Sequence, residues 1–169
     1  MTKEDSDIID TSSKIYNRRM IHGFTVHYEP DVFDVCPNLL ATLREDLFYM
    51  CVLLPERACE KLQRSTHLWI NTELTYGDRS KPIHGKHCCF HPGAGWLQKM
   101  GMNVAKCGGV EMYSAQDYLD SRHLWGPGGL LLHEYCHAYH CHHTPGGYDC
   151  IAVREVCHIF MHCIGSCGH

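Results

Sequence analysis

Two histidines four residues apart enclose a glutamate in the stretch His133-Glu134-Tyr135-Cys136-His137, which has the form HExxH. On a helix, residues i and i+4 lie about 6 Å apart on one face, so both imidazoles can reach a single Zn²⁺. An adjacent carboxylate that does not bind the metal can take a proton from water that the metal activates. The pattern therefore predicts zinc as cofactor, with His133 and His137 as ligands and Glu134 as the general base.

The HExxH pattern alone is only a moderate signal, because the chain holds 15 histidines in 169 residues. The residues that precede it strengthen the prediction. The preceding "WGPGG" frees the backbone to turn, and Leu130, Leu131 and Leu132 then make the start of the helix apolar. The competing hypothesis is a surface helix with incidental histidines. The apolar approach favours a buried metal-binding helix.

A catalytic zinc usually has a third protein ligand. His143 follows His137 by six residues, as the last histidine of a metzincin does, but His140 stands where the metzincin chain needs a glycine to turn. His140 itself lies too far along the helix from the first histidine to share one zinc. We predict Glu155, on an expected helix over residues 151–161, as the third ligand. His143, or no third protein ligand, is the open alternative, and an exposed Glu155 is the competing hypothesis.

The cysteines suggest other chemistry. The spacings of the Cys and His residues in the C-terminal segment match no standard zinc ribbon or finger, so we expect a disordered, reactive end there. A structural metal knot is the alternative, built from Cys150, Cys157, His158, His162, Cys163 and Cys167. Cys136 has a histidine beside it, as a nucleophile would, but we expect it to be a small buried apolar residue. For Cys88 and Cys89 we expect packing roles.

Composition limits the classes of partner. With 44% hydrophobic and 20% charged residues, a chain of this length is expected to form one globular domain. The net charge of −4 and the absence of any Lys/Arg run longer than a pair predict no nucleic-acid partner. No segment approaches the roughly 20 apolar residues that span a bilayer, so no membrane partner is predicted either. Twelve cysteines without an export signal favour reduced thiols or metal ligands, and with them a cytoplasmic location.

Hydrophobic periodicity predicts the elements that would position the histidines. Apolar residues at helical spacing predict a helix over residues 37–54, followed by a short helix over 55–65. A half-buried strand is expected over 66–74 and another strand over 110–113. Helices thus precede a sheet in an α+β fold. We divide the chain into a flexible polar leader (1–20), one domain (21–148) and a His/Cys-rich tail (149–169).

Three stretches together resemble a known family: "CCFHPGAGWLQKMGMN", "GGVEMYSAQDYL" and "WGPGGLLLHEYCHAYH". They are similar to a family of uncharacterised zinc metallopeptidase-like domains, itself similar to the catalytic domain of anthrax lethal factor, a gluzincin. The resemblance covers residues 21–148. It implies a zincin-like metallopeptidase domain with a small mixed sheet and an HExxH active-site helix. It also implies that residues 110–114 border the cleft and bind an extended peptide by adding it as a strand.

The chain departs from this family at the third zinc ligand. In the family that ligand is a glutamate in a later helix, in a pattern like "EYFAE" preceded by a tyrosine that can stabilise an oxyanion. Residues 150–169, "CIAVREVCHIFMHCIGSCGH", do not match that pattern, and we expect a divergent or truncated C-terminus. The sequence predicts a zinc metalloendopeptidase acting on peptides or proteins. The alternative is a catalytically incomplete relative that binds zinc or peptide without cleaving.

Overall fold

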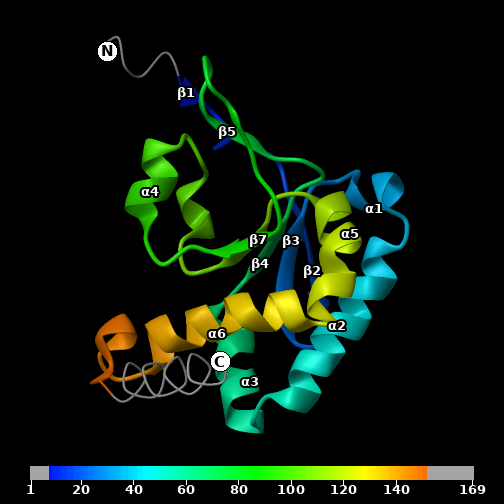
Figure 1. The fold of residues 1–169 in the computed structure, drawn as a ribbon, viewed down its shortest axis with the longest axis vertical. Coiled ribbons are helices and arrows are strands. Elements are labelled where there is room, and N and C mark those ends of the chain that lie inside the picture. Colours follow the sequence, from blue (N-terminus) through cyan, green and yellow to red (C-terminus); the bar gives the residue numbers. More distant parts are fainter. Residues whose placement is uncertain (1–7, 152–169) are drawn as a thin grey trace, which may run out of the picture.

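The computed structural model describes residues 8–151 and has an α+β architecture (Figure 1). The helices predicted over 37–54 and 55–65 and the HExxH helix are confirmed within a few residues at their ends. In chain order the elements are β1 (Ile8–Ile9), β2 (Asn17–Ile21), β3 (Phe24–Tyr28), α1 (Val32–Val35), α2 (Leu39–Leu53), α3 (Glu56–Ser65), β4 (Leu68–Ile70), β5 (Thr75–Asp78), β6 (Ile83–His84), β7 (Cys88–Phe90), α4 (Ala94–Lys99), β8 (Val110–Met112), α5 (Ala115–Trp125) and α6 (Gly129–His143), with 3₁₀ turns at Val104–Lys106 and Gly147–Asp149.

The main sheet is mixed and has the strand order β2-β3-β4-β8-β7. Its three central strands, β3, β4 and β8, run parallel, and β2 and β7 pair antiparallel at the two edges. β4 was expected to be half-buried, but all three of its residues are buried. Both faces of the strand are covered: Leu68 and Ile70 lie in the core with the helices, and Tyr16 packs edge-on against Trp69 on the other face.

Helices α2, α5 and α6 cover one face of this sheet (Figure 1). On α2 the buried positions Leu39, Leu43, Leu47 and Met50 follow the helical repeat, and they pack in one core with strand residues such as Val110. Among residues 8–151, no helix combines the length and the apolar character needed to span a bilayer.

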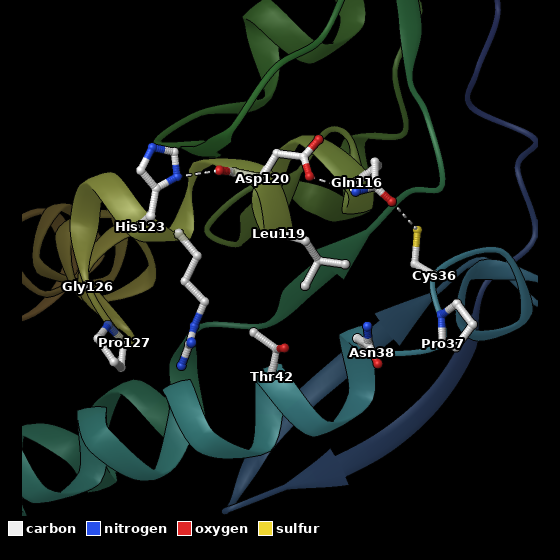
Figure 2. A pocket seen from close by; sticks show the side chains of 11 residues that line it. Cys36, Pro37, Asn38, Thr42, Gln116, Leu119, Asp120, His123, Gly126 and Pro127 are labelled. Atoms are coloured by element: carbon white, nitrogen blue, oxygen red, sulfur yellow. Dashed lines mark hydrogen bonds between the residues drawn. The ribbon is translucent and has the colours of Figure 1, made fainter.

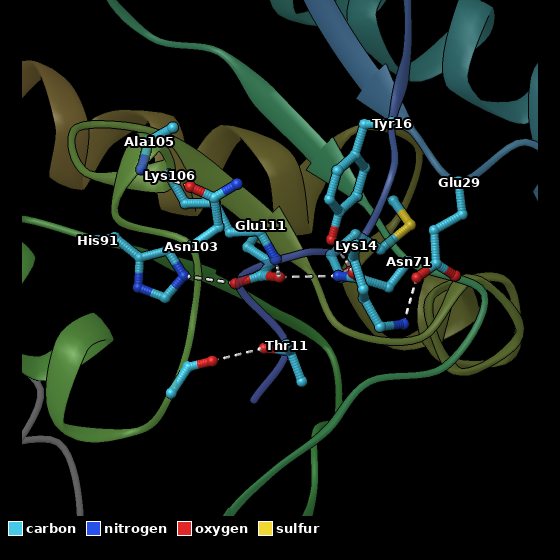
Figure 3. Close-up of polar contacts among 12 residues, drawn as sticks. Thr11, Lys14, Tyr16, Glu29, Asn71, His91, Asn103, Ala105, Lys106 and Glu111 are labelled. Carbon is cyan, nitrogen blue, oxygen red and sulfur yellow. Dashed lines mark hydrogen bonds and ion pairs between the residues drawn. The ribbon is translucent and has the colours of Figure 1, made fainter. Parts of the chain in front are cut away.

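The opposite face of the sheet carries a buried polar network (Figure 3). Glu111 lies between two core residues of β8 and therefore points away from the helices. Its carboxylate accepts hydrogen bonds from Lys106 Nζ, from Asn71 Nδ2 at 2.8 Å and from His91 Nε2 at 2.7 Å. Burial raises the pKa of Glu111, but the His91 hydrogen bond and the Lys106 charge outweigh it and bring that pKa below its ordinary value.

The flexible leader predicted over residues 1–20 is wrong from residue 8 onward. β1 pairs with β5 in a second sheet of order β1-β5-β6, and β2 forms a hairpin with β3 across the proposed boundary. Between them, Tyr16 Oη donates to Asn71 Oδ1 at 2.6 Å. Polarity misled the prediction because β2 is an edge strand and most of its residues are solvated. Strands therefore precede the helices as well as follow them.

Candidate metal centre

A tight contact between helices sets the start of α6. Gly128, just before the helix, has φ +71°, and a Cβ there would lie 2.8 Å from the backbone oxygen of Asp46 on α2. Only glycine allows both this conformation and this approach. The Gly- and Pro-containing turn "GPGG" thus lets α6 begin against α2. The sequence predicts this turn but not the contact with α2.

The apolar side of α6 decides which way its histidines point. Leu131, Tyr135 and Ala138 are fully buried, and the Tyr135 ring packs edge-on against Phe24 of β3 with centroids 5.1 Å apart. Tyr135 occupies one variable position of HExxH, so its burial orients the whole motif. The two histidines of the motif consequently lie on the solvent side of the helix.

His133 and His137 bring their ring nitrogens together. Their Nε2 atoms are 3.1 Å apart, and the two rings meet edge to face with centroids 4.6 Å apart. Two imidazoles on one tetrahedral zinc would have nitrogens about 3.3 Å apart, given Zn–N bonds of about 2.0–2.1 Å. The His133 side chain is 49% exposed, so the site is open to solvent. We call these two residues the imidazole pair.

Glu134 lies on the next face of α6 and is held by β7. Its Oε2 accepts the backbone N–H of Phe90 at 2.8 Å, and its side chain is only 12% exposed. Its Oε1 lies 4.0 Å from His133 Nε2 and accepts no hydrogen bond from the described residues. One oxygen therefore positions the carboxylate while the other is available beside the imidazole pair.

No third ligand joins the pair within residues 8–151, where no group of three His, Cys, Asp or Glu side chains could hold a metal. His143 points elsewhere: its Nε2 hydrogen-bonds Ser65 Oγ on α3 at 2.9 Å. The His140 ring lies edge-on to Tyr148, with centroids 5.0 Å apart. Glu155 lies outside the described residues, as do the candidate ligands of a tail metal knot other than Cys150.

Tyr148 is a neighbour of the site that the sequence did not single out. Gly146 and Gly147, at φ +83° and +53°, reverse the chain after α6. Tyr148 then lies back along the helix, where its Oη donates to the backbone oxygen of His137 at 3.3 Å. The only sequence signal is the "PGGY" turn, which predicts a reversal but not its partner.

A groove of about 570 Å³ adjoins the imidazole pair on the side of α3. Its walls combine apolar residues of the α2–α3 corner with residues of α6 and the turn after it: Leu54, Pro55, Ala58, Leu62, His133, Cys136, His137, Tyr139, His140 and Thr144. Cys136 is exposed here, so its predicted burial is wrong. Desolvation nevertheless raises the pKa of Cys136, which argues against an activated thiolate.

A second hollow, of about 670 Å³, lies between the start of α2 and α5 (Figure 2). It shares no residue with the groove beside the imidazole pair. Its walls mix polar and apolar residues, with Asn38 and Thr42 facing Gln116 and Asp120. Arg122, also in its wall, is held by the buried carboxylate of Asp46 at 2.8 Å. We therefore place the candidate chemistry at α6 and not in this larger hollow.

The strand predicted to receive a peptide is not at an edge. β8 pairs with β4 on one side and with β7 on the other, and Ser114 bridges to Glu73. Residues 110–114 cannot add another strand because their backbone groups are already paired. β7, which packs beside α6, is the outer strand there. Cys88 and Cys89 both lie on it, and Cys88 is buried in the core, consistent with packing.

Comparisons of the chain with protein-family models, with curated proteins and with solved structures give no match.

Proposed function

We propose that this protein is a zinc-dependent metallopeptidase with a zincin-like fold, and that α6 carries its active site. The observation that carries the proposal is the 3.1 Å approach of the His133 and His137 Nε2 atoms beside the carboxylate of Glu134. Unprotonated imidazole nitrogens at this separation suit one tetrahedral zinc. An uncoordinated carboxylate next to them suits a proton-transfer role.

The imidazole pair would hold the metal together with Glu155 from the C-terminal segment. Bound there, Zn²⁺ supplies Lewis acidity, which lowers the pKa of water and polarises a peptide carbonyl. A third ligand matters because two imidazoles alone bind zinc weakly.

Glu134 performs the proton transfer in this proposal. Its Oε1 accepts a proton from the attacking water and then returns it to the amine that leaves the cleaved peptide bond. The Phe90 N–H on Oε2 keeps the carboxylate aimed at the site, so little reorganisation accompanies the transfer.

The substrate would be an extended peptide that passes the imidazole pair along the solvent side of α6. The adjoining groove, with Leu54, Ala58 and Leu62 in its wall, would accept an apolar side chain of that peptide.

A non-cleaving relative that binds zinc or peptide is the second candidate function. It is favoured by one specific observation: within residues 8–151 the imidazole pair has no third protein ligand. Such a protein would keep the zinc affinity of the site without peptidase activity.

Metal analysis of purified full-length variants tests the ligands. We expect about one zinc per chain in the wild type and its loss in His133→Ala and His137→Ala. His142→Ala is the matched control, because this exposed histidine on the same helix lies against Phe90 and not at the pair. Glu155→Gln should weaken zinc binding if Glu155 is the third ligand. Retention of zinc in His133→Ala together with its loss on removal of residues 150–169 would place the metal in the tail and refute the proposal.

Cleavage of a peptide library tests the reaction. Glu134→Gln keeps an amide oxygen that can accept the Phe90 N–H, so the local geometry should survive. We expect this variant to retain zinc and to lose at least about 100-fold in kcat. If wild type and Glu134→Gln both bind zinc and neither cleaves, the non-cleaving alternative is correct. Equal cleavage by the two would show that Glu134 is not the base.

A further inference from the structure

Two thiols of neighbouring helices meet between α2 and α3, at the margin of the hydrophobic core. Cys51 of α2 and Cys59 of α3 have their Sγ atoms 3.6 Å apart. A disulfide requires an S–S distance of about 2.05 Å, so the sulfurs need to approach by only about 1.5 Å. The two helices are joined directly at Leu54–Pro55, which keeps this geometry local.

The two thiols have different surroundings. Cys59 is buried, and its S–H donates to the Cys51 sulfur. Cys51 is partly exposed, and its sulfur also receives a hydrogen bond from Gln63 Nε2 at 3.8 Å. The Cys51 sulfur in turn lies 3.8 Å from the backbone oxygen of His22, to which its S–H can donate, and its partial exposure gives a small oxidant access to it. Desolvation and the hydrogen bond to Cys51 raise the pKa of Cys59 to about 12, which keeps it a protonated donor.

We propose that Cys51 and Cys59 form a peroxide-oxidised thiol pair, in which Cys51 is the site of attack and Cys59 resolves the product. The Cys51 thiolate attacks one oxygen of hydrogen peroxide, giving a sulfenic acid and hydroxide. The Cys59 sulfur then displaces the sulfenic oxygen while the Cys59 S–H proton passes to that oxygen, forming the disulfide and releasing water. In total two thiols and one hydrogen peroxide give one disulfide and two waters. This chemistry uses neither the imidazole pair nor a metal.

A comparison with the other cysteines of residues 8–151 supports the pairing of Cys51 with Cys59. Among the cysteines of residues 8–151, Cys51 and Cys59 are the two whose sulfurs contact each other through a hydrogen bond. Cys107 is exposed but makes no such contact. Oxidation at Cys107 would therefore stop at the sulfenic acid or proceed between molecules, whereas Cys51 has an internal partner.

Peptide mapping of the folded full-length protein tests the proposal. The reduced protein is treated with hydrogen peroxide, alkylated and digested with trypsin, which cleaves after Arg44, Arg57 and Lys61. Each cysteine then lies alone in its peptide, residues 45–57 or 58–61. We expect the two peptides joined, with a mass two hydrogens below their sum. Chelator-treated protein should give the same product, so the outcome is independent of the zinc proposal.

Three variants assign the roles. Cys59→Ser should accumulate a sulfenic acid on Cys51 that dimedone captures, Cys51→Ser should leave Cys59 unoxidised, and the control Cys107→Ser should form the link as wild type does. Absence of the joined peptide while Cys107 is oxidised would overturn the proposal, and so would a dimedone adduct on Cys59 in Cys51→Ser. Equal yield of the link in concentrated urea would also overturn it, because proximity along the chain would then explain the product.

Discussion

Replacing Lys106 with methionine tests the buried network on the far side of the sheet. Lys106 and Glu111 are both fully buried, and the ammonium is the one full positive charge bonded to that carboxylate within residues 8–151. Methionine keeps most of the side-chain volume and removes the charge. Loss of one partner from a buried ion pair costs about 3–5 kcal/mol. Because Asn71 and His91 still donate to the carboxylate, we expect the lower end, about 3 kcal/mol.

The stability difference between Lys106→Met and the wild type should depend on pH in a defined direction. In the wild type the pKa of Glu111 lies below its ordinary value, so its ionisation stabilises the fold above about pH 4.5, and that contribution is lost as the pH falls through the folded pKa. Without Lys106 only the hydrogen bonds from His91 and Asn71 oppose desolvation, so the folded pKa of Glu111 rises from its wild-type value. Relative to the wild type, the variant is then penalised increasingly as the pH rises. The stability difference should be largest near about pH 7–8 and should shrink towards about pH 4.

Urea unfolding followed by tryptophan fluorescence at several pH values measures this difference. Lys99→Met, at an exposed position of α4, is the matched control and should stay within about 0.5 kcal/mol of the wild type. A Lys106→Met deficit below about 1 kcal/mol, or one that does not change between about pH 5 and pH 8, would refute the reasoning, since a buried unpaired charge must produce both effects.

Three further outcomes follow from the packing. Gly128→Ala should destabilise the protein by about 1–3 kcal/mol, because φ is +71° there and the new Cβ meets the Asp46 oxygen. Gly95→Ala, in open space on α4, is the control and should stabilise the protein by about 0.5–1 kcal/mol. Thermal unfolding measures both differences. Tyr118→Phe removes a hydrogen bond to the buried Asp46 carboxylate and should cost about 1.5–3 kcal/mol in urea unfolding, and a cost near zero would show that the bond is not formed. Desolvation and a neighbouring histidine lower the pKa of His27 to about 4, so the folded state resists its protonation and stability falls as the pH drops below about 6.5. His27→Gln should reduce that acid loss, and an unchanged pH profile would contradict the assignment.

Local periodicity was enough to predict part of this molecule. The apolar repeat of α2 and the glycines before α6 place both helices correctly, because helix formation depends on residues within a few turns of each other. The closeness of His133 and His137 follows from the same local geometry, since i and i+4 are neighbours on any helix. These features needed no knowledge of what packs around them.

Long-range packing decided the rest. Glu134 gains its orienting hydrogen bond from Phe90, forty-four residues away, and no spacing in the motif encodes that partner. The same holds for β8, whose apolar alternation predicts a strand but not that β4 and β7 enclose it. Polar edge strands resemble loops in composition, so β2 was mistaken for a leader. A sequence pattern specifies which face of an element is apolar, whereas the neighbour that covers this face is determined only when distant segments pack together.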